Sequence, residues 1–217
     1  MRRELVIDAY MDLVCPWCLI GKRQLDRALV EFERSQPDVV VDLRWHSVQL
    51  LPDVPADGLD FMTFYIQRLG SIQAVRQRQT QVIAAARAVD LQLDFSRVAR
   101  MPNTLRVHQL LSFAAAQLSR ALHAALLDRL FAAHFIRGED LGDLATLRQV
   151  AAEFALNTDL LDSWLLRGAG KPQAHALPGV PFFVFNHHLS LPGAQPVQGL
   201  LAAMREALCA TWVEPTA

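Results

Sequence analysis

The sequence predicts an α/β fold in which a helical segment interrupts a sheet, and three observations carry this prediction. First, a strand, a helix and a second strand follow one another between residues 5 and 45. Second, strand signals fade and helical patterns dominate from about residue 58 to residue 170. Third, β-branched and aromatic residues return at 180–185, and an amphipathic helix follows them.

The first three elements predict a βαβ unit. Residues 5–10 form a short apolar run, which is typical of a buried strand. Residues 15–32 have apolar side chains at roughly helical spacing, with charged residues such as Lys22 and Asp26 expected on the solvent side. After a turn, residues 39–45 alternate apolar and charged side chains, as a strand should. This order requires a parallel pair of strands.

The middle of the chain predicts an all-helical insertion domain at residues 58–170. Six segments have helical patterns: 61–69, 71–89, 102–117, 119–135, 143–154 and 159–166. The flanking segments, 1–57 and 171–217, are then expected to form the core domain. In its second part we predict a strand at 180–185, a tight turn at 186–188, a hairpin partner at 189–191 and a helix at 195–209.

Composition favours a soluble globular protein and excludes several classes of function. Hydrophobic residues make up 52% of the 217 residues, charged residues 20%, and the formal net charge is -1. Basic residues are scattered, so we expect no nucleic-acid partner. The first apolar run is too short for a secretory signal, and no stretch approaches the ~20 apolar residues of a membrane span. We therefore expect a cytoplasmic protein without membrane association, and the apolar content permits a homodimer.

The motif Cys15-Pro16-Trp17-Cys18 carries the chemistry. Cys15 follows a strand, so it should lie at the start of the next helix, where unpaired N–H groups and the helix dipole stabilise a thiolate and lower the pKa of the thiol. Cys15 is the expected nucleophile, and Cys18, one helical turn further on, is the expected resolving residue. Pro16 suits the first helical turn, and Trp17 offers a face for binding substrate.

Two other interpretations of the cysteine pair stay open. A CxxC can be half of a zinc site, which His187 and His188 would have to complete. The pair can also be chemically inert. A redox pair is favoured over both, because a strand, a CxxC and a helix at the start of a βαβ unit are the context of redox motifs. We therefore predict no metal, and no cofactor beyond a redox-active disulfide between Cys15 and Cys18.

Three sequence blocks resemble the DsbA family of thiol–disulfide oxidoreductases, and within it the cytoplasmic FrnE-like branch. The first is VCPWCLIGKR at 14–23, which looks like the active-site segment of that branch. The second is Pro102-Asn103-Thr104 followed by His108. The third is GVPFFV at 179–184, with GAQP at 193–196 after it. The resemblance covers nearly the whole chain.

This resemblance implies a thioredoxin-like fold, a mixed sheet flanked by helices, with the helical insertion. It implies an enzyme that reduces, forms or isomerises disulfides of a protein or a small molecule. It also implies that Pro181 is a cis proline facing the CxxC and that the backbone of Val180 pairs with an extended substrate. One departure concerns Ala9, which stands where relatives often have a buried acid; Asp8 is expected on the opposite strand face.

A second class of enzyme stays open as the alternative. Kappa-type glutathione transferases and 2-hydroxychromene-2-carboxylate isomerases resemble this fold, but they generally carry serine where this chain has Cys15. Glutathione therefore stays open as a co-substrate, and so does a non-catalytic binding module. Among other candidates, His108 is expected to be a satisfied buried histidine, His46 has no obvious partner, and Cys209 is expected to be a packed small hydrophobe.

Overall fold

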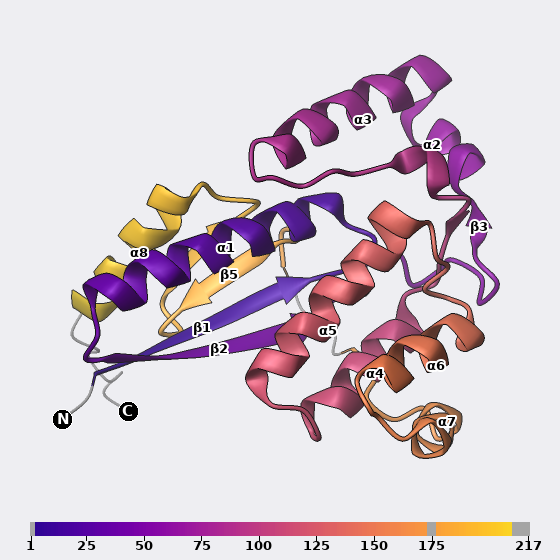
Figure 1. Ribbon diagram of the computed structural model, residues 1–217. Coiled ribbons are helices and arrows are strands. Elements are labelled where there is room, and N and C mark those ends of the chain that lie inside the picture. The colour runs from indigo at the N-terminus through magenta and orange to yellow at the C-terminus, as the bar shows by residue number, and fades with distance from the viewer. Residues whose placement is uncertain (1–2, 173–176, 210–217) are drawn as a thin grey trace, which may run out of the picture. The chain divides into compact units, whose positions relative to one another are not determined.

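The computed structural model describes residues 3–172 and 177–209 of the chain (Figure 1). Its strands are β1 (Arg3–Met11), β2 (Val39–Ser47), β3 (Leu59–Asp60), β4 (Arg100–Met101), β5 (Phe182–Phe185) and β6 (Leu189–Pro192). Its α-helices are α1 (Pro16–Ser35), α2 (Phe61–Leu69), α3 (Ile72–Arg87), α4 (Leu105–Ala115), α5 (Arg120–Ala132), α6 (Leu144–Glu153), α7 (Thr158–Leu166) and α8 (Val197–Cys209).

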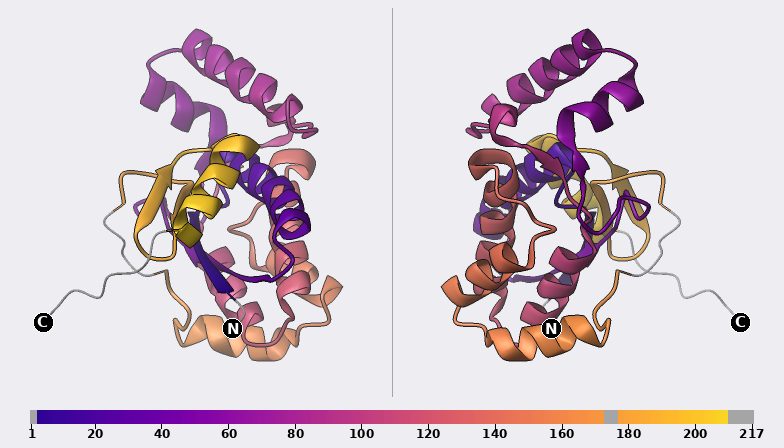
Figure 2. Two further views of the ribbon diagram at one scale, coloured as in Figure 1. Left: turned by 90° about the vertical axis from the view of Figure 1, so that its left-hand side faces the viewer. Right: turned by 90° about the vertical axis from the view of Figure 1, so that its right-hand side faces the viewer.

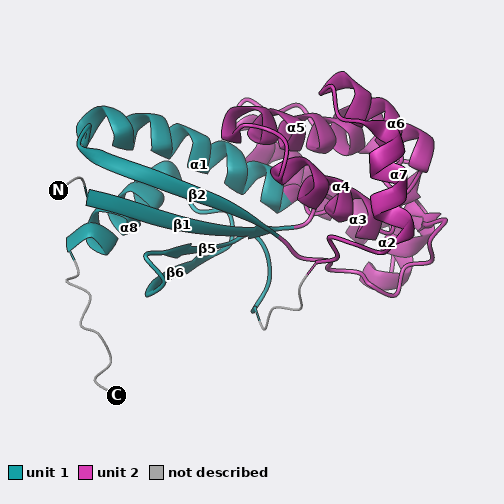
Figure 3. Cartoon of the chain, turned by 90° about the horizontal axis from the view of Figure 1, so that it is seen from below, with its two compact units in different colours: residues 1–11, 17–46, 176–217 teal, residues 12–16, 47–175 magenta. Residues whose placement is uncertain are grey.

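The chain divides into two compact units (Figure 3). Unit 1 takes residues 1–11, 17–46 and 176–217, and unit 2 takes residues 12–16 and 47–175. The predicted domain limits at residues 58 and 170 stay a prediction, because compactness alone does not define an independently folding domain.

Unit 1 contains a four-stranded mixed sheet with the strand order β2-β1-β5-β6. β1 pairs antiparallel with β5, and β5 pairs antiparallel with β6. β1 and β2, which α1 connects, run in the same direction (Figure 1). This is the βαβ unit that the sequence predicts, and the mixed sheet with its helices confirms the predicted fold class.

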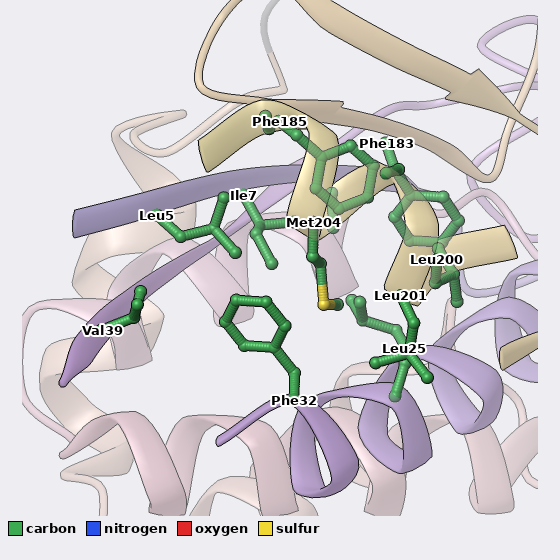
Figure 4. Close-up of a cluster of buried hydrophobic side chains, with 14 residues drawn as sticks. Leu5, Ile7, Leu25, Phe32, Val39, Phe183, Phe185, Leu200, Leu201 and Met204 are labelled. Carbon is green, nitrogen blue, oxygen red and sulfur yellow. The ribbon is translucent and has the colours of Figure 1, made fainter. Parts of the chain in front are cut away.

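One face of this sheet carries the core of unit 1. The register pairs Ile7 with Phe185 and Ala9 with Phe183, so these side chains share a face. The helices α1 and α8 cover that face, as Figure 2 shows, and Figure 4 shows the buried side chains that they contribute. Phe32 comes from α1 and Met204 from α8, and both are fully buried. Burial of this apolar area is what holds the helices to the sheet.

The turn between β5 and β6 is fastened to the rest of unit 1 by Asn186. Its side-chain oxygen accepts a hydrogen bond from the backbone N–H of Val6 at 2.9 Å, and its amide nitrogen donates to the carbonyl oxygen of Ala207 at 2.9 Å. The φ angle of Asn186 is 45°, a left-handed conformation that asparagine tolerates better than most residues. One side chain thus joins the turn, β1 and α8, and the predicted turn at 186–188 is confirmed.

Unit 2 consists mainly of helices whose starts are capped by side chains. Asp60, Ser71, Ser119, Asp143 and Asn157 each accept a hydrogen bond from a backbone N–H in the first turn of the helix that follows. The helix α4 is largely buried and contacts α5, α6 and α7. All six predicted helical segments are therefore confirmed as helices.

The differences from prediction lie at helix ends and in very short elements. α4 begins at Leu105 rather than at 102, because the side-chain oxygen of Asn103 accepts from the N–H of Leu105. The predicted segment 119–135 is α5 followed by a π-helical turn at Ala133–Arg137. The two-residue strands β3 and β4 leave no periodic signal. Within the described residues, no helix is long and apolar enough to cross a membrane.

We expect Asn186→Ala to lower the free energy of unfolding by about 1–3 kcal/mol, because it removes two hydrogen bonds and places alanine at a positive φ. Urea-induced unfolding followed by circular dichroism measures this change. Ser190→Ala, an exposed substitution in the neighbouring strand β6, is the control and should change stability by less than about 0.5 kcal/mol. Equal midpoints for the two variants would contradict the assigned role of Asn186.

Candidate active site

Cys15 lies in the turn that connects β1 to α1. The turn is closed by a hydrogen bond from the N–H of Cys15 to the carbonyl oxygen of Asp12, at 3.2 Å. Helix α1 begins at the next residue, Pro16, so Cys15 occupies the helix start that the sequence predicts. The first turn of α1 has no acidic side chain. The partial positive charge of a helix start favours a thiolate at this position.

Cys18 lies one turn further along α1, on its buried face in unit 1. It is 1% exposed, whereas Cys15 is 8% exposed, and both cysteines are reduced in this structure. The predicted nucleophile is therefore the more accessible of the two residues. Pro16 and Trp17, between the two cysteines, are both partly buried.

Gly21 allows α1 to approach Pro181 closely within unit 1. A Cβ atom at Gly21 would lie 2.9 Å from Cγ of Pro181 and 3.4 Å from Cζ of Phe183. The peptide bond between Val180 and Pro181 is cis, the conformation that the family resemblance implies. Pro181 is buried and Val180 partly buried, immediately before β5. The structure thus brings Pro181 against the helix that carries Cys18.

Lys22 is buried, and its predicted position on the solvent side of α1 is wrong. It is 2% exposed, and its Nζ lies 2.9 Å from Oδ2 of Asp26 and 5.8 Å from the centre of the Trp45 ring. The carboxylate and the aromatic face supply the partners that allow an ammonium group to be buried.

The opposite face of the sheet carries a polar cluster around Asp8. Asp8 is 6% exposed and accepts from Nε2 of His46 at 2.6 Å, so the expectation that His46 lacks a partner is wrong. The ring of Tyr10 stacks on His46 with a centroid distance of 4.6 Å. Burial, and then the charge of Asp8, raise the pKa of Tyr10. Asp8 lies on the face opposite to Ala9, as predicted, so this carboxyl is not directed into the core beneath α1.

In unit 2, a buried network surrounds the carboxylate of Asp12. Asp12 and His108 are both 0% exposed, and Nε2 of His108 lies 3.0 Å from Oδ1 of Asp12. Oδ2 of Asp12 accepts from the N–H of Leu50 at 2.8 Å and from the hydroxyl of Thr104 at 3.3 Å. His108 is thus the buried histidine that we expected, and its partner precedes Cys15 by three residues.

Tyr65 is a site residue that sequence reasoning missed. With Pro16 it lines a small cavity of about 30 Å³ in unit 2, whose other lining residues are Phe61, Leu69, Val75, Arg78, Gln79, Val82 and Phe95. Burial, and then the negative charge of a nearby Cys15 thiolate, raise the pKa of Tyr65 to about 12. Its hydroxyl therefore keeps its proton at neutral pH and is a hydrogen-bond donor near Cys15. A lone tyrosine inside a helical pattern gives no sequence signal for such a role.

His187, His188 and Cys209 are the remaining candidates from the sequence. Within residues 3–172 and 177–209, no group of three His, Cys, Asp or Glu side chains is arranged to hold a metal ion. His187 and His188 are exposed in the turn, with His187 3.5 Å from Asp8. Cys209 is exposed at the end of α8, so its predicted packing as a small hydrophobe is wrong.

The chain belongs to the family of DSBA-like thioredoxin domains, because the model of that family matches residues 6–205. Among solved structures, it is similar to a probable DsbA oxidoreductase from Streptomyces coelicolor, with 25% sequence identity and a TM-score of 0.84. That match covers 98% of this chain and 94% of the other.

Two more distant structures share the fold. The cytosolic disulfide reductase DsbM from Pseudomonas aeruginosa has 16% identity and a TM-score of 0.61, and the match covers 94% of this chain and 98% of the other. A 2-hydroxychromene-2-carboxylate isomerase has 12% identity and a TM-score of 0.59, with coverage of 93% and 95%. No curated protein matches the chain significantly.

We expect Gly21→Ala to destabilise the protein by about 1–3 kcal/mol, because the new methyl group meets the ring of Pro181 at 2.9 Å. Gly199→Ala is the matched control. It lies in α8 of the same unit, where a new Cβ meets no atom closer than 3.6 Å, so better helix propensity should leave stability equal or higher. Thermal unfolding of both variants measures the effect. An unchanged melting temperature for Gly21→Ala would show that the contact with Pro181 is not tight.

Proposed function

We propose that this protein is a thiol–disulfide oxidoreductase that works through Cys15 and Cys18. The observation that carries the proposal is the CxxC at the start of α1 in a chain of the DSBA-like family, with the first cysteine more accessible than the second. Attack on a disulfide requires a thiolate, and a helix start favours this form of a cysteine.

The reaction has two exchange steps. The thiolate of Cys15 attacks one sulfur of the substrate disulfide, a mixed disulfide forms, and the other substrate sulfur leaves as a thiolate. The thiolate of Cys18 then attacks the sulfur of Cys15, which releases the second substrate thiol and leaves a Cys15–Cys18 disulfide. The substrate gains two electrons and the CxxC loses them. A dithiol, or two molecules of a thiol such as glutathione, returns the CxxC to its reduced state.

We propose four residues for substrate binding, as the family resemblance implies. Pro16 and Trp17 lie between Cys15 and Cys18, and Val180 and Pro181 directly precede β5. The family resemblance implies that an extended substrate chain pairs with the backbone of Val180. We further propose that the partner is a thiol- or disulfide-containing protein or small molecule, that the protein is cytoplasmic and FrnE-like, and that reduction or isomerisation prevails over oxidation there.

The alternative is a glutathione-dependent transferase or isomerase. The observation that favours it is the shared fold with a 2-hydroxychromene-2-carboxylate isomerase. The cysteine at position 15 argues against it, because such enzymes generally carry serine at that position. This alternative predicts turnover that survives loss of Cys18.

We expect Cys15 and Cys18 to interconvert reversibly between dithiol and disulfide in defined glutathione buffers. Alkylation of the remaining thiols followed by mass measurement reports the ratio. Cys15→Ser should abolish disulfide exchange with a model substrate, and Cys18→Ser should trap a mixed disulfide at Cys15.

Cys209→Ser is the control, because this residue is exposed and lies outside the CxxC. It should leave both the equilibrium and the exchange rate unchanged. If no intramolecular disulfide forms at any ratio of reduced to oxidised glutathione, the oxidoreductase assignment fails and the glutathione-dependent alternative takes its place.

A further inference from the structure

The buried carboxylate of Asp12 has no part in the two exchange steps described above. Burial of an ionised carboxylate is costly unless several donors compensate it. Here the compensation comes from the N–H of Leu50, the hydroxyl of Thr104 and Nε2 of His108, all within 3.3 Å. An acceptor surrounded by donors is the arrangement that an ionised carboxylate requires. The fold therefore provides the partners that a buried carboxylate needs at this position.

The same residue is tied to the nucleophile through the backbone. The carbonyl oxygen of Asp12 accepts the N–H of Cys15 at 3.2 Å, so the two residues close one turn. The side chain of Asp12 fixes this turn to the segment of Leu50 and to the start of α4, which carries Thr104 and His108. The position of the charge relative to Cys15 is thus set by hydrogen bonds on both sides of the turn.

A second buried imidazole, that of His134, does not offset the charge of Asp12. His134 is 1% exposed, its Nε2 has no hydrogen-bond partner among the described residues, and burial lowers its pKa to about 4, although the charge of Asp12 opposes the shift. His134 is therefore neutral at physiological pH. Nδ1 of His108 also meets no partner within the described part of the chain, and Nε2 of the same ring lies 3.0 Å from Oδ1 of Asp12.

We propose that Asp12 is a positioning residue that makes the Cys15 thiolate less stable than the helix start alone would make it, and so poises the CxxC as an electron donor. This inference rests on the proposed oxidoreductase function and gives a physical cause for the direction of electron flow proposed there. A negative charge disfavours a nearby thiolate. Because the reduced form of the motif is the one that carries the thiolate, the same charge favours the Cys15–Cys18 disulfide. A pair that prefers its disulfide gives its electrons to substrate.

The test is Asp12→Asn in a Cys209→Ser background. The second substitution removes the exposed thiol, so that it does not contribute to the measured alkylation. Asparagine keeps the oxygen that accepts from Leu50 and Thr104 but carries no charge. We expect Cys15 to be alkylated roughly three to ten times faster at a fixed, mildly acidic pH. We also expect the equilibrium with glutathione to shift toward the dithiol by a similar factor.

Two control variants distinguish the effect of the Asp12 charge from the effect of a lost hydrogen bond. Thr104→Val keeps the charge of Asp12 and removes one donor, so it should lower stability and leave the alkylation rate within about twofold of wild type. Asp8→Asn makes the same chemical change in an Asp–His pair of unit 1. It should also leave the rate within about twofold.

If Asp12→Asn does not fold, the double variant Asp12→Asn with His108→Gln replaces it, because the two amides can hydrogen bond without any charge. It should show the same faster alkylation. The proposal is overturned if the folded variant reacts at the wild-type rate, or if Thr104→Val accelerates alkylation as much as Asp12→Asn does. Failure of the oxidoreductase function is a different outcome, in which wild type forms no Cys15–Cys18 disulfide at all.

Discussion

The alternation of side chains along β1 is the constraint on which the rest of the structure depends. Ile7 and Ala9 point into the core beneath α1 and α8, while Asp8 and Tyr10 point to the other face. The strand then runs directly into the turn that carries Cys15. Because the inward residues must stay buried, a slip of one position would expose the core and rotate the start of the turn as well. The core and the site therefore share one register.

The elements of the fold were accessible from the sequence because each has a strong local cause. Period-two and helical patterns found every strand of the main sheet and every long helix, and the CxxC between a strand and a helix located the site. The placement of Asp8 opposite Ala9 also followed from alternation alone. Local periodicity is sufficient for such statements, because it depends only on the nearest neighbours along the chain.

The contacts that tertiary structure creates were out of reach. Lys22 follows the apolar face of α1 but looks like a solvent-side charge until Asp26 and the Trp45 ring are seen beside it. Asp12 and His108 are 96 residues apart, and the local sequence around either residue does not indicate that the two form a contact. Tyr65 reads as one more apolar residue of a helix, yet it shares a cavity with Pro16. Burial of polar groups is decided by such distant partners, which a single sequence does not display.

The exposed thiol of Cys209 affects how the protein behaves in the laboratory. An accessible cysteine at the last turn of α8 is open to air oxidation and to coupling with a second molecule. Disulfide-linked dimers would then accumulate in a stored sample. They would resemble a native dimer on a non-reducing gel but would disappear when the sample is reduced. Freshly reduced protein, or a chain without this sulfur, is the proper starting point for judging how many copies associate.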